Sequence, residues 1–161
     1  MPLTIVIAQP TNVPDLARLH GVVQDLHAFL SPDIFHCDWL LSELNILWLA
    51  RLANFNSKVF IAKLDENIVG YVWFEIIVRE QDATHIFRRR MHVHHIVVDE
   101  IARGEGIGER LLAEAELEAK RLGISDITLD VWTSNSIAQT LFSKRGYNPV
   151  YISLMKKVET F

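Results

Sequence analysis

The sequence has little that would tie the chain together covalently or hold it in a membrane. Cys37 is its one cysteine, so no disulfide can form within the chain, which favours a reducing compartment. No stretch approaches the roughly 18 continuous apolar residues of a membrane span. The first ten residues lack the basic segment of a signal peptide and predict a strand. We therefore expect a cytoplasmic protein that does not associate with a membrane.

The sequence also lacks a basic excess and any sign of internal division. The formal net charge is −4, which argues against nucleic acid as a partner. No repeat, low-complexity segment or linker interrupts the 161 residues, a length suited to one domain. We therefore predict a single domain over residues 1–161. Apolar residues make up 50% of the chain, enough for a well-filled core and for a homodimer surface.

Hydrophobic periodicity predicts alternating strands and helices. Helices are predicted at residues 13–29, 40–54, 107–122 and 136–145. Strands are predicted at residues 3–8, 58–64, 68–78, 86–98, 127–132 and 149–158. The order β-α-α-β-β-β-α-β-α-β indicates an α/β fold with a mixed sheet. Both faces of the strand at 68–78 are largely apolar, so it should be covered on both sides.

The strand at 86–98 carries three histidines near its end. Regular alternation places His92 and His94 on one face, together with Ile96 and Val98, and His95 on the other face. Only two of the histidines could then share an ion, and no cysteine or carboxylate cluster completes a site. We therefore expect no bound metal, and we interpret His95 as a core histidine.

A glycine-rich turn, residues 103–108, separates this strand from the next helix. Its sequence is Arg-Gly-Glu-Gly-Ile-Gly. Glycine permits a positive φ and lets a ligand approach the backbone without meeting a Cβ. The N–H groups at a helix N-terminus attract negative charge. The turn therefore predicts an anion site, for a phosphate or a pyrophosphate.

Two common phosphate-binding patterns fit this turn poorly. The dinucleotide fingerprint spaces its glycines as Gly-x-Gly-x-x-Gly, and a Walker loop ends in Gly-Lys-Ser/Thr. Here the glycines alternate, and Gly108 is followed by Glu109 and Arg110.

The turn instead resembles the Arg/Gln-x-x-Gly-x-Gly/Ala signature of the GNAT superfamily of N-acetyltransferases. Val98 lies five residues before Arg103, as in the family pattern. Residues 135–147 resemble the family's later Asn-x-x-Ala-x-x-Leu-Tyr-x-Lys-x-Gly-Phe segment. The predicted order of elements resembles the GNAT fold over essentially the whole chain.

The resemblance implies acetyl-CoA, or another acyl-CoA, as acyl donor and an amine as acceptor. It places the pyrophosphate on the N–H groups of residues 104–108 and the pantetheine arm along the strand end. Asn135 would contact the cofactor, although it also suits a helix N-cap, and Lys144 is alternatively a solvated residue. The cofactor-binding residues implied in this way are Ile96, Val97, Val98, Arg103, Gly104, Glu105, Gly106, Ile107, Gly108, Asn135, Phe142 and Lys144.

The candidate catalytic residues are His94, His92 and Glu75. In several family members a glutamate lies four residues before the valine matched by Val98, and His94 stands there in this chain. Histidine titrates near neutral pH, so His94 either removes the amine proton or only shapes the pocket. His92 is the next candidate. Glu75 is a third, but pairing with nearby histidines or arginines is favoured for it.

One position departs from the family pattern. Many members have a tyrosine beside the sulfur of CoA, and the corresponding residue is Phe142, which cannot donate a proton.

The leading prediction is an N-acetyltransferase that acts by direct attack of a primary amine of a small molecule or protein. The alternative is a non-catalytic module that binds or senses acyl-CoA. Residues 29–39, Arg88, Arg90 and His92 are predicted to line the acceptor pocket.

Overall fold

The computed structural model describes residues 2–158. The chain divides into two compact units, with the boundary between Asp130 and Val131. In the described range, the first unit contains five strands and three helices, and the second contains one helix. None of the described helices is both long and apolar enough to cross a membrane.

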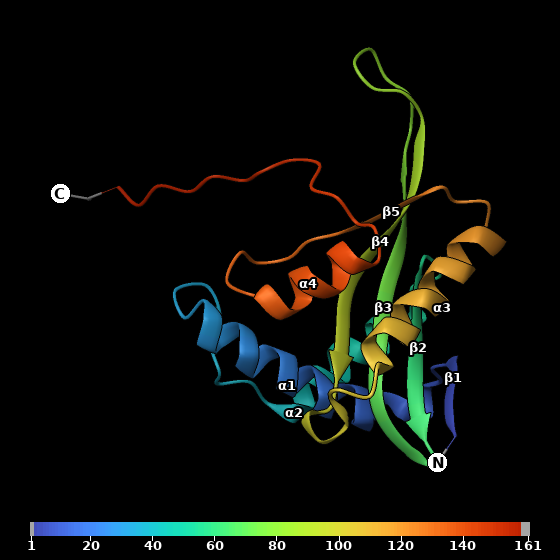
Figure 1. Ribbon diagram of the computed structural model, residues 1–161, viewed down its shortest axis with the longest axis vertical. Coiled ribbons are helices and arrows are strands. Elements are labelled where there is room, and N and C mark those ends of the chain that lie inside the picture. The colour runs from blue at the N-terminus through green and yellow to red at the C-terminus, as the bar shows by residue number, and fades with distance from the viewer. Residues whose placement is uncertain (1, 159–161) are drawn as a thin grey trace. The chain divides into compact units, whose positions relative to one another are not determined.

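The first unit is built on one five-stranded sheet. Its strands are β1 (Leu3–Ile7), β2 (Ser57–Leu64), β3 (Asn67–Arg79), β4 (Arg88–Val98) and β5 (Asp126–Leu129). They lie in the order β1-β2-β3-β4-β5 (Figure 1). Neighbours are antiparallel from β1 to β4, and β5 runs parallel to β4. This mixed sheet confirms the predicted fold class.

Helices cover both faces of the sheet. Helices α1 (Val13–Leu30) and α2 (Leu41–Ala53) pack on one face, and α3 (Ile107–Arg121) packs on the other. Each helix buries an apolar stripe of the kind that periodicity predicts, such as Leu16 and Leu19 on α1. These three helices begin and end within two residues of the predicted boundaries.

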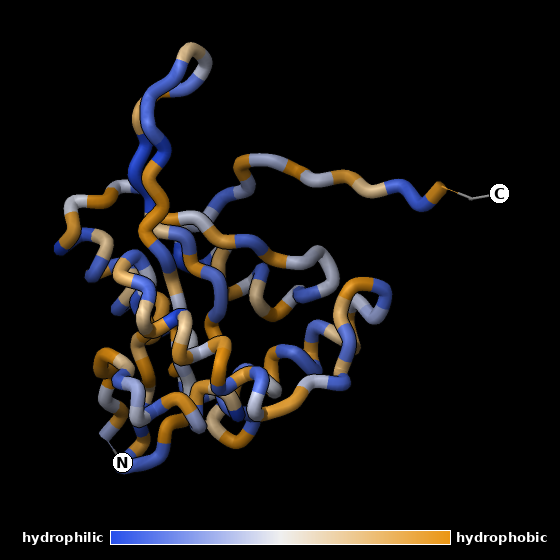
Figure 2. Tube along the Cα trace, turned by 180° about the vertical axis from the view of Figure 1, so that it is seen from behind, coloured by the Kyte–Doolittle hydropathy of each residue, from blue (hydrophilic) through white to orange (hydrophobic). Residues whose placement is uncertain are grey.

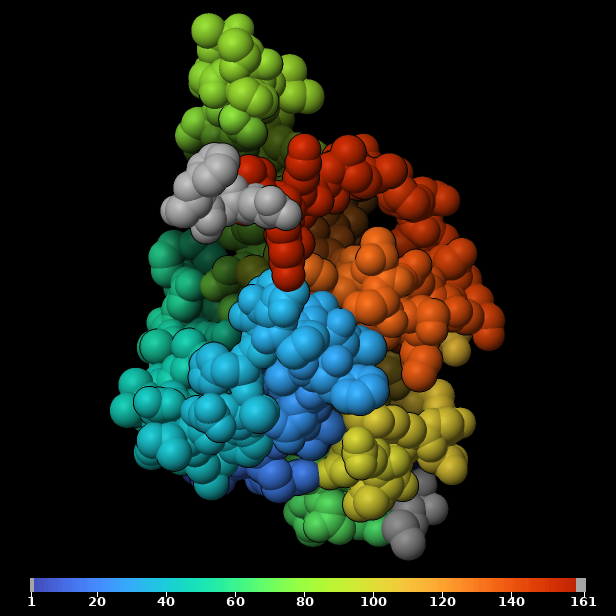
Figure 3. All heavy atoms as spheres, turned by 90° about the vertical axis from the view of Figure 1, so that its left-hand side faces the viewer, coloured from blue at the N-terminus to red at the C-terminus, as the bar shows by residue number. Residues whose placement is uncertain are grey.

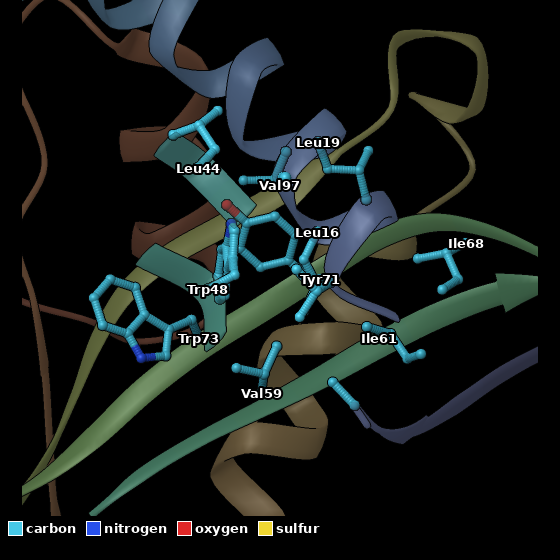
Figure 4. Close-up of a cluster of buried hydrophobic side chains, with 13 residues drawn as sticks. Leu16, Leu19, Leu44, Trp48, Val59, Ile61, Ile68, Tyr71, Trp73 and Val97 are labelled. Carbon is cyan, nitrogen blue, oxygen red and sulfur yellow. The ribbon is translucent and has the colours of Figure 1, made fainter. Parts of the chain in front are cut away.

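Two apolar clusters fill the space between the helices and the sheet. The cluster under α1 and α2 contains Trp48 and Tyr71, whose rings meet edge to face at 5.0 Å (Figure 4). The cluster under α3 contains Phe74 and Leu111. Tyr71 and Phe74 both come from β3, so this strand is covered on both faces, as its sequence predicts.

A β-bulge interrupts the alternation of β4. Trp73 of β3 pairs with His95, and the next residue, Phe74, pairs with Val93, so His94 is an extra residue in β4. Because of this extra residue, Val93 and Ile96 both face α3. The prediction of regular alternation across this strand is therefore wrong beyond Val93.

The β3–β4 hairpin projects from the first unit as an arm whose tip is hydrophilic (Figures 1 and 2). At the tip, Asp82 Oδ1 accepts hydrogen bonds from the N–H groups of Thr84 at 2.7 Å and His85 at 2.8 Å. These side-chain bonds hold a turn where pairing would otherwise continue. Strand β4 consequently begins at Arg88, two residues later than predicted.

The second unit contains α4 (Ser136–Lys144), close to its predicted bounds. The prediction of a strand at 149–158 is wrong, since none of these residues lies in a strand. Alternating apolar residues favour an extended backbone, but a strand also needs a partner for its N–H and C=O groups. Apolar side chains of this segment are largely exposed, as at Leu154.

Packing of α3 on the sheet should supply a large share of the stability. Leu111 is fully buried, whereas Leu117 on the same helix is 45% exposed. We expect Leu111→Ala to lower the free energy of unfolding by about 2–5 kcal/mol, because it leaves a cavity. Leu117→Ala should cost below about 1 kcal/mol. Urea unfolding followed by tryptophan fluorescence measures both, and equal losses would contradict the packing described for α3.

Candidate functional site

The glycine turn lies between the end of β4 and the start of α3, after a short 3-10 turn, η2 (Glu100–Ala102). Gly104 and Gly106 have φ values of 86° and 72°, a conformation that glycine adopts without strain. A Cβ built on either residue would meet no atom within 4 Å. The turn is therefore exposed to open space on the surface of the first unit (Figure 3, yellow).

This turn presents backbone donors at the N-terminus of α3. Gly106 is the N-cap, and the first hydrogen bond within the helix runs from Arg110 N–H to the Gly106 carbonyl at 3.1 Å. The N–H groups of Ile107 and Gly108 precede that bond and have no acceptor inside the helix. Together with the helix dipole they form a local site for a negative group.

Arg103, an exposed residue, connects the turn to the end of β4. Its Nε donates to the carbonyl of Val98 at 3.3 Å, and its Nη1 lies 3.3 Å from Glu100 Oε1. The guanidinium thus connects the last residue of β4 to the turn. A direct role of Arg103 or Glu105 with a phosphate stays a prediction.

The last residues of β4 have one edge without a strand neighbour in the first unit. Strand β3 pairs with β4 as far as Val98, whereas β5 pairs only with residues 90–93. Pairing with β5 thus stops directly before the bulge at His94. The other edge of Ile96, Val97 and Val98 can accept an extended chain, which is the arrangement predicted for the pantetheine arm.

The bulge brings all three histidines to the side of the sheet covered by α1 and α2. His92 and His95 pair with Glu75 and Trp73 of β3, and His94 stacks on Trp73 with ring centroids 4.2 Å apart. The expectation that His95 faces away from His92 and His94 is therefore wrong. Even so, within residues 2–158 no three His, Cys, Asp or Glu side chains are grouped so as to hold a metal ion.

His94 and Glu75 form a hydrogen-bonded pair. His94 Nε2 lies 2.9 Å from Glu75 Oε2, and Asn54 Nδ2 donates to the other carboxylate oxygen at 3.0 Å. The pairing of Glu75 with a histidine confirms what the sequence favours. With Nε2–H donating to Glu75, the lone pair of Nδ1 is left to accept a proton.

His92 lies beside this pair, with its ring centroid 4.7 Å from that of His94. Its Nδ1 lies 2.9 Å from Thr128 Oγ1 on β5. Burial, followed by the neighbouring charge of His94, lowers the pKa of His92. A neutral His92 is therefore favoured at neutral pH.

His95 is partly buried, against Tyr71 and Trp73 of the cluster under α1 and α2. Its Nδ1 is 3.1 Å from the Tyr71 hydroxyl, and its ring meets that of His20 at 5.0 Å. Burial holds the pKa of His95 well below its ordinary value of 6.5. Burial, then the nearby Arg51 charge, lowers the pKa of His20 to about 4. The interpretation of His95 as a core histidine is therefore wrong in part: Tyr71 satisfies its ring nitrogen, but the side chain is only partly buried and lies on the opposite face from the one expected.

A pocket of about 470 Å³ opens between α1, α2 and the bulge of β4. It includes His94 and three residues of the loop that joins the two helices, Phe35, His36 and Trp39. Of residues 29–39, predicted to line the acceptor pocket, these three line the pocket, and Trp39 also packs against the core. Use of the pocket by an acceptor stays a prediction.

Other predicted lining residues are absent from this pocket. Arg88, Arg90 and His92 are not among its lining residues, and Arg88 Nε instead bonds to Asp126 Oδ2 at 2.9 Å. Arg51 is a lining residue that sequence reasoning missed. It ends an amphipathic helix, where a basic residue is expected for the helix dipole alone, so no local signal distinguishes it.

The remaining predicted site residues belong to the second unit. Asn135 caps α4, because its Oδ1 accepts a hydrogen bond from Ala138 N–H at 3.1 Å, which confirms the N-cap interpretation. The ring of Phe142 lies 6.0 Å from that of Tyr147, and Lys144 ends the helix. Their roles toward a cofactor stay predictions.

Comparison with known proteins identifies a family. The profile of the acetyltransferase (GNAT) family matches residues 23–147. A search among curated proteins found no match.

Solved structures share the fold. A tetramutant of the BH1408 protein from Bacillus halodurans has a TM-score of 0.86 and 23% identity, covering 96% of this chain and 99% of that one. A predicted acetyltransferase from Clostridium acetobutylicum, solved with acetyl-CoA, has a TM-score of 0.74 and 20% identity, covering 97% and 96%. An aminoglycoside N-acetyltransferase, AAC(6')-Iy, solved with CoA, has a TM-score of 0.73 and 16% identity, covering 99% and 96%.

The buried histidines should make stability depend on pH. The unfolded chain protonates His20 near its ordinary pKa of 6.5, whereas the folded protein protonates it only at about 4. The unfolded state therefore binds more protons in this window, and the free energy of unfolding falls as the pH is lowered through it. Urea unfolding from about pH 7 to about pH 4.5 measures the decrease.

Two variants separate His20 from the remaining titratable groups. In His20→Gln the decrease between the two pH values should be smaller than in the wild type. His85→Gln, at an exposed position on the hairpin arm, should leave the decrease unchanged. An identical decrease in wild type and His20→Gln would contradict the assignment.

Proposed function

The chain belongs to the acetyltransferase (GNAT) family, and we propose that it transfers an acetyl group from acetyl-CoA to a primary amine of a small molecule or a protein. Membership of the family supports acyl transfer in general. The observation that carries the proposal is the position of His94. It lies at the bulge where the unpaired edge of β4 begins, and it also lines the pocket.

The donor side of the proposed site consists of the glycine turn and the edge of β4. The N–H groups of Ile107 and Gly108 suit a pyrophosphate, because they are donors at a helix N-terminus with no acceptor inside the helix. The edge of residues 96–98 suits an extended arm that carries amide groups, since such an arm can pair as a strand does. The thioester would then lie near His94.

The acceptor side is the pocket between α1, α2 and β4. An amine attacks a thioester only as the neutral base, so a proton has to leave the nitrogen. His94 accepts that proton at Nδ1, while Glu75 holds the ring and stabilises the imidazolium that forms. The new bond joins nitrogen to the acetyl carbon, and the carbon–sulfur bond breaks with release of the CoA thiolate.

Donor binding can be tested with matched glycine variants. Gly106 and Gly123 both have positive φ, at 72° and 66°, and a Cβ on either meets open space. Because the two φ values are similar, alanine imposes similar backbone strain at both positions. The two glycines lie at opposite ends of α3, so only Gly106 is part of the proposed donor site. Gly106→Ala should weaken acetyl-CoA binding about tenfold or more, because it disturbs hydrogen bonds to a charged group. Gly123→Ala should bind acetyl-CoA as the wild type does.

Calorimetry measures these affinities, and release of free thiol in the presence of a broad panel of amines measures turnover. Turnover with at least one amine is the expected result. Failure to bind acetyl-CoA would contradict the proposal entirely. Binding without turnover on any amine would favour the second candidate, a non-catalytic acyl-CoA module, to which Phe142 at the tyrosine position of the family pattern points.

The role of His94 can be tested by substitution. His94→Gln should lower kcat/KM by about 10²–10⁴-fold, the usual contribution of a general base. Glu75→Gln should lower the rate less, because the ring keeps its nitrogen but loses its orienting partner. His85→Gln on the hairpin arm serves as the control and should leave kcat/KM unchanged. An unchanged kcat/KM in His94→Gln would remove His94 as the base.

A further inference from the structure

The pocket contains an arginine whose charge no carboxylate of the described chain neutralises. Arg51, in the last turn of α2, places its guanidinium 3.8 Å from the ring centre of Trp73 and 4.8 Å from that of Trp48. The two indoles lie next to each other in the cluster under α1 and α2 (Figure 4). Stacking of this kind holds the plane of the guanidinium and leaves its edge to donate hydrogen bonds.

Among residues 2–158, no carboxylate forms an ion pair with Arg51. The ion pairs within 4.0 Å in this range involve other cations. Arg51 Nη1 lies 3.4 Å from His20 Nδ1. His20 is neutral at neutral pH, so this contact supplies an acceptor but no charge.

Two carboxylates are candidates to neutralise Arg51, and neither forms an ion pair with it. Glu75 attracts Arg51 electrostatically but bonds to His94 and Asn54. Glu43 lines the same pocket but lies eight residues before Arg51 on α2, or about 12 Å along the helix axis. The guanidinium is half-buried, and desolvation lowers its pKa. Burial without a partner carries a cost that an anionic ligand would offset.

We propose that Arg51 binds a carboxylate of the acceptor, so that the acceptor is a primary amine which also carries a carboxylate, as an amino acid does. This inference rests on the proposed function. Arg51 and His94 both line this pocket and both contact the ring of Trp73, so one small acceptor in the pocket is offered both groups. The fork of donors on one guanidinium matches the two oxygens and the single charge of a carboxylate.

The experiment compares matched acceptors. A series of amino acids and the primary amides of the same amino acids are assayed with acetyl-CoA, together with amines that carry no carboxylate. The wild type should show a kcat/KM at least about tenfold higher for the acids than for their amides, because a charge-assisted hydrogen bond is lost in the amide. This ratio requires no variant.

Variants then assign the preference to Arg51. In Arg51→Gln the ratio should fall close to one, mainly through a higher KM for the acids, with acetyl-CoA affinity unchanged. Arg51→Lys should retain part of the preference, since it keeps the charge and loses the fork of donors. Arg79→Gln is the matched control, because Arg79 also contacts a histidine nitrogen, that of His85 at 3.0 Å, but lies on the hairpin arm.

The outcomes separate the two proposals. Turnover confined to amines without a carboxylate, or an equal kcat/KM for acids and amides, would overturn the role of Arg51 and leave the acetyltransferase proposal standing. A preference that persists in Arg51→Gln would overturn it as well. Acetyl-CoA binding without turnover on any amine would overturn the proposed function, and this inference with it.

Discussion

The bulge at His94 is the constraint on which the rest of the site depends. One extra residue in β4 changes which side chains face α1 and α2, and it places His94 against Trp73. The pairing between β4 and β5 ends one residue earlier, at Val93. A single local irregularity thus leaves a backbone edge open on one side and supplies a titratable side chain to a pocket on the other.

The glycine turn depends on the same strand. Because β4 runs to Val98 with its outer edge open, the turn that follows it and the start of α3 lie at the end of that edge. Arg103 connects the turn to the carbonyl of Val98, which keeps the two parts in register. The donor and acceptor sides proposed for the reaction are therefore both positioned by β4.

Charge in the pocket follows from burial as much as from sequence. Burial and the Arg51 guanidinium favour neutral imidazoles at His20 and His95. A neutral pair of histidines cannot balance Arg51, and Glu75 is held by His94. The result is a pocket with a localised positive charge close to a proposed base, which suits an acceptor with an anionic group next to its amine.

The sequence by itself determined the mixed α/β class, nearly all of the elements and the glycine turn. These depend on local sequence. Apolar periodicity defines helices and strands, and the alternating glycines mark the turn, where Gly104 and Gly106 adopt a positive φ. Only the tertiary structure decided the face on which each histidine lies, because a bulge arises from the pairing of β3 with β4. It also decided that residues 149–158 form no strand and that Arg51 enters the pocket, since partners distant in sequence control both.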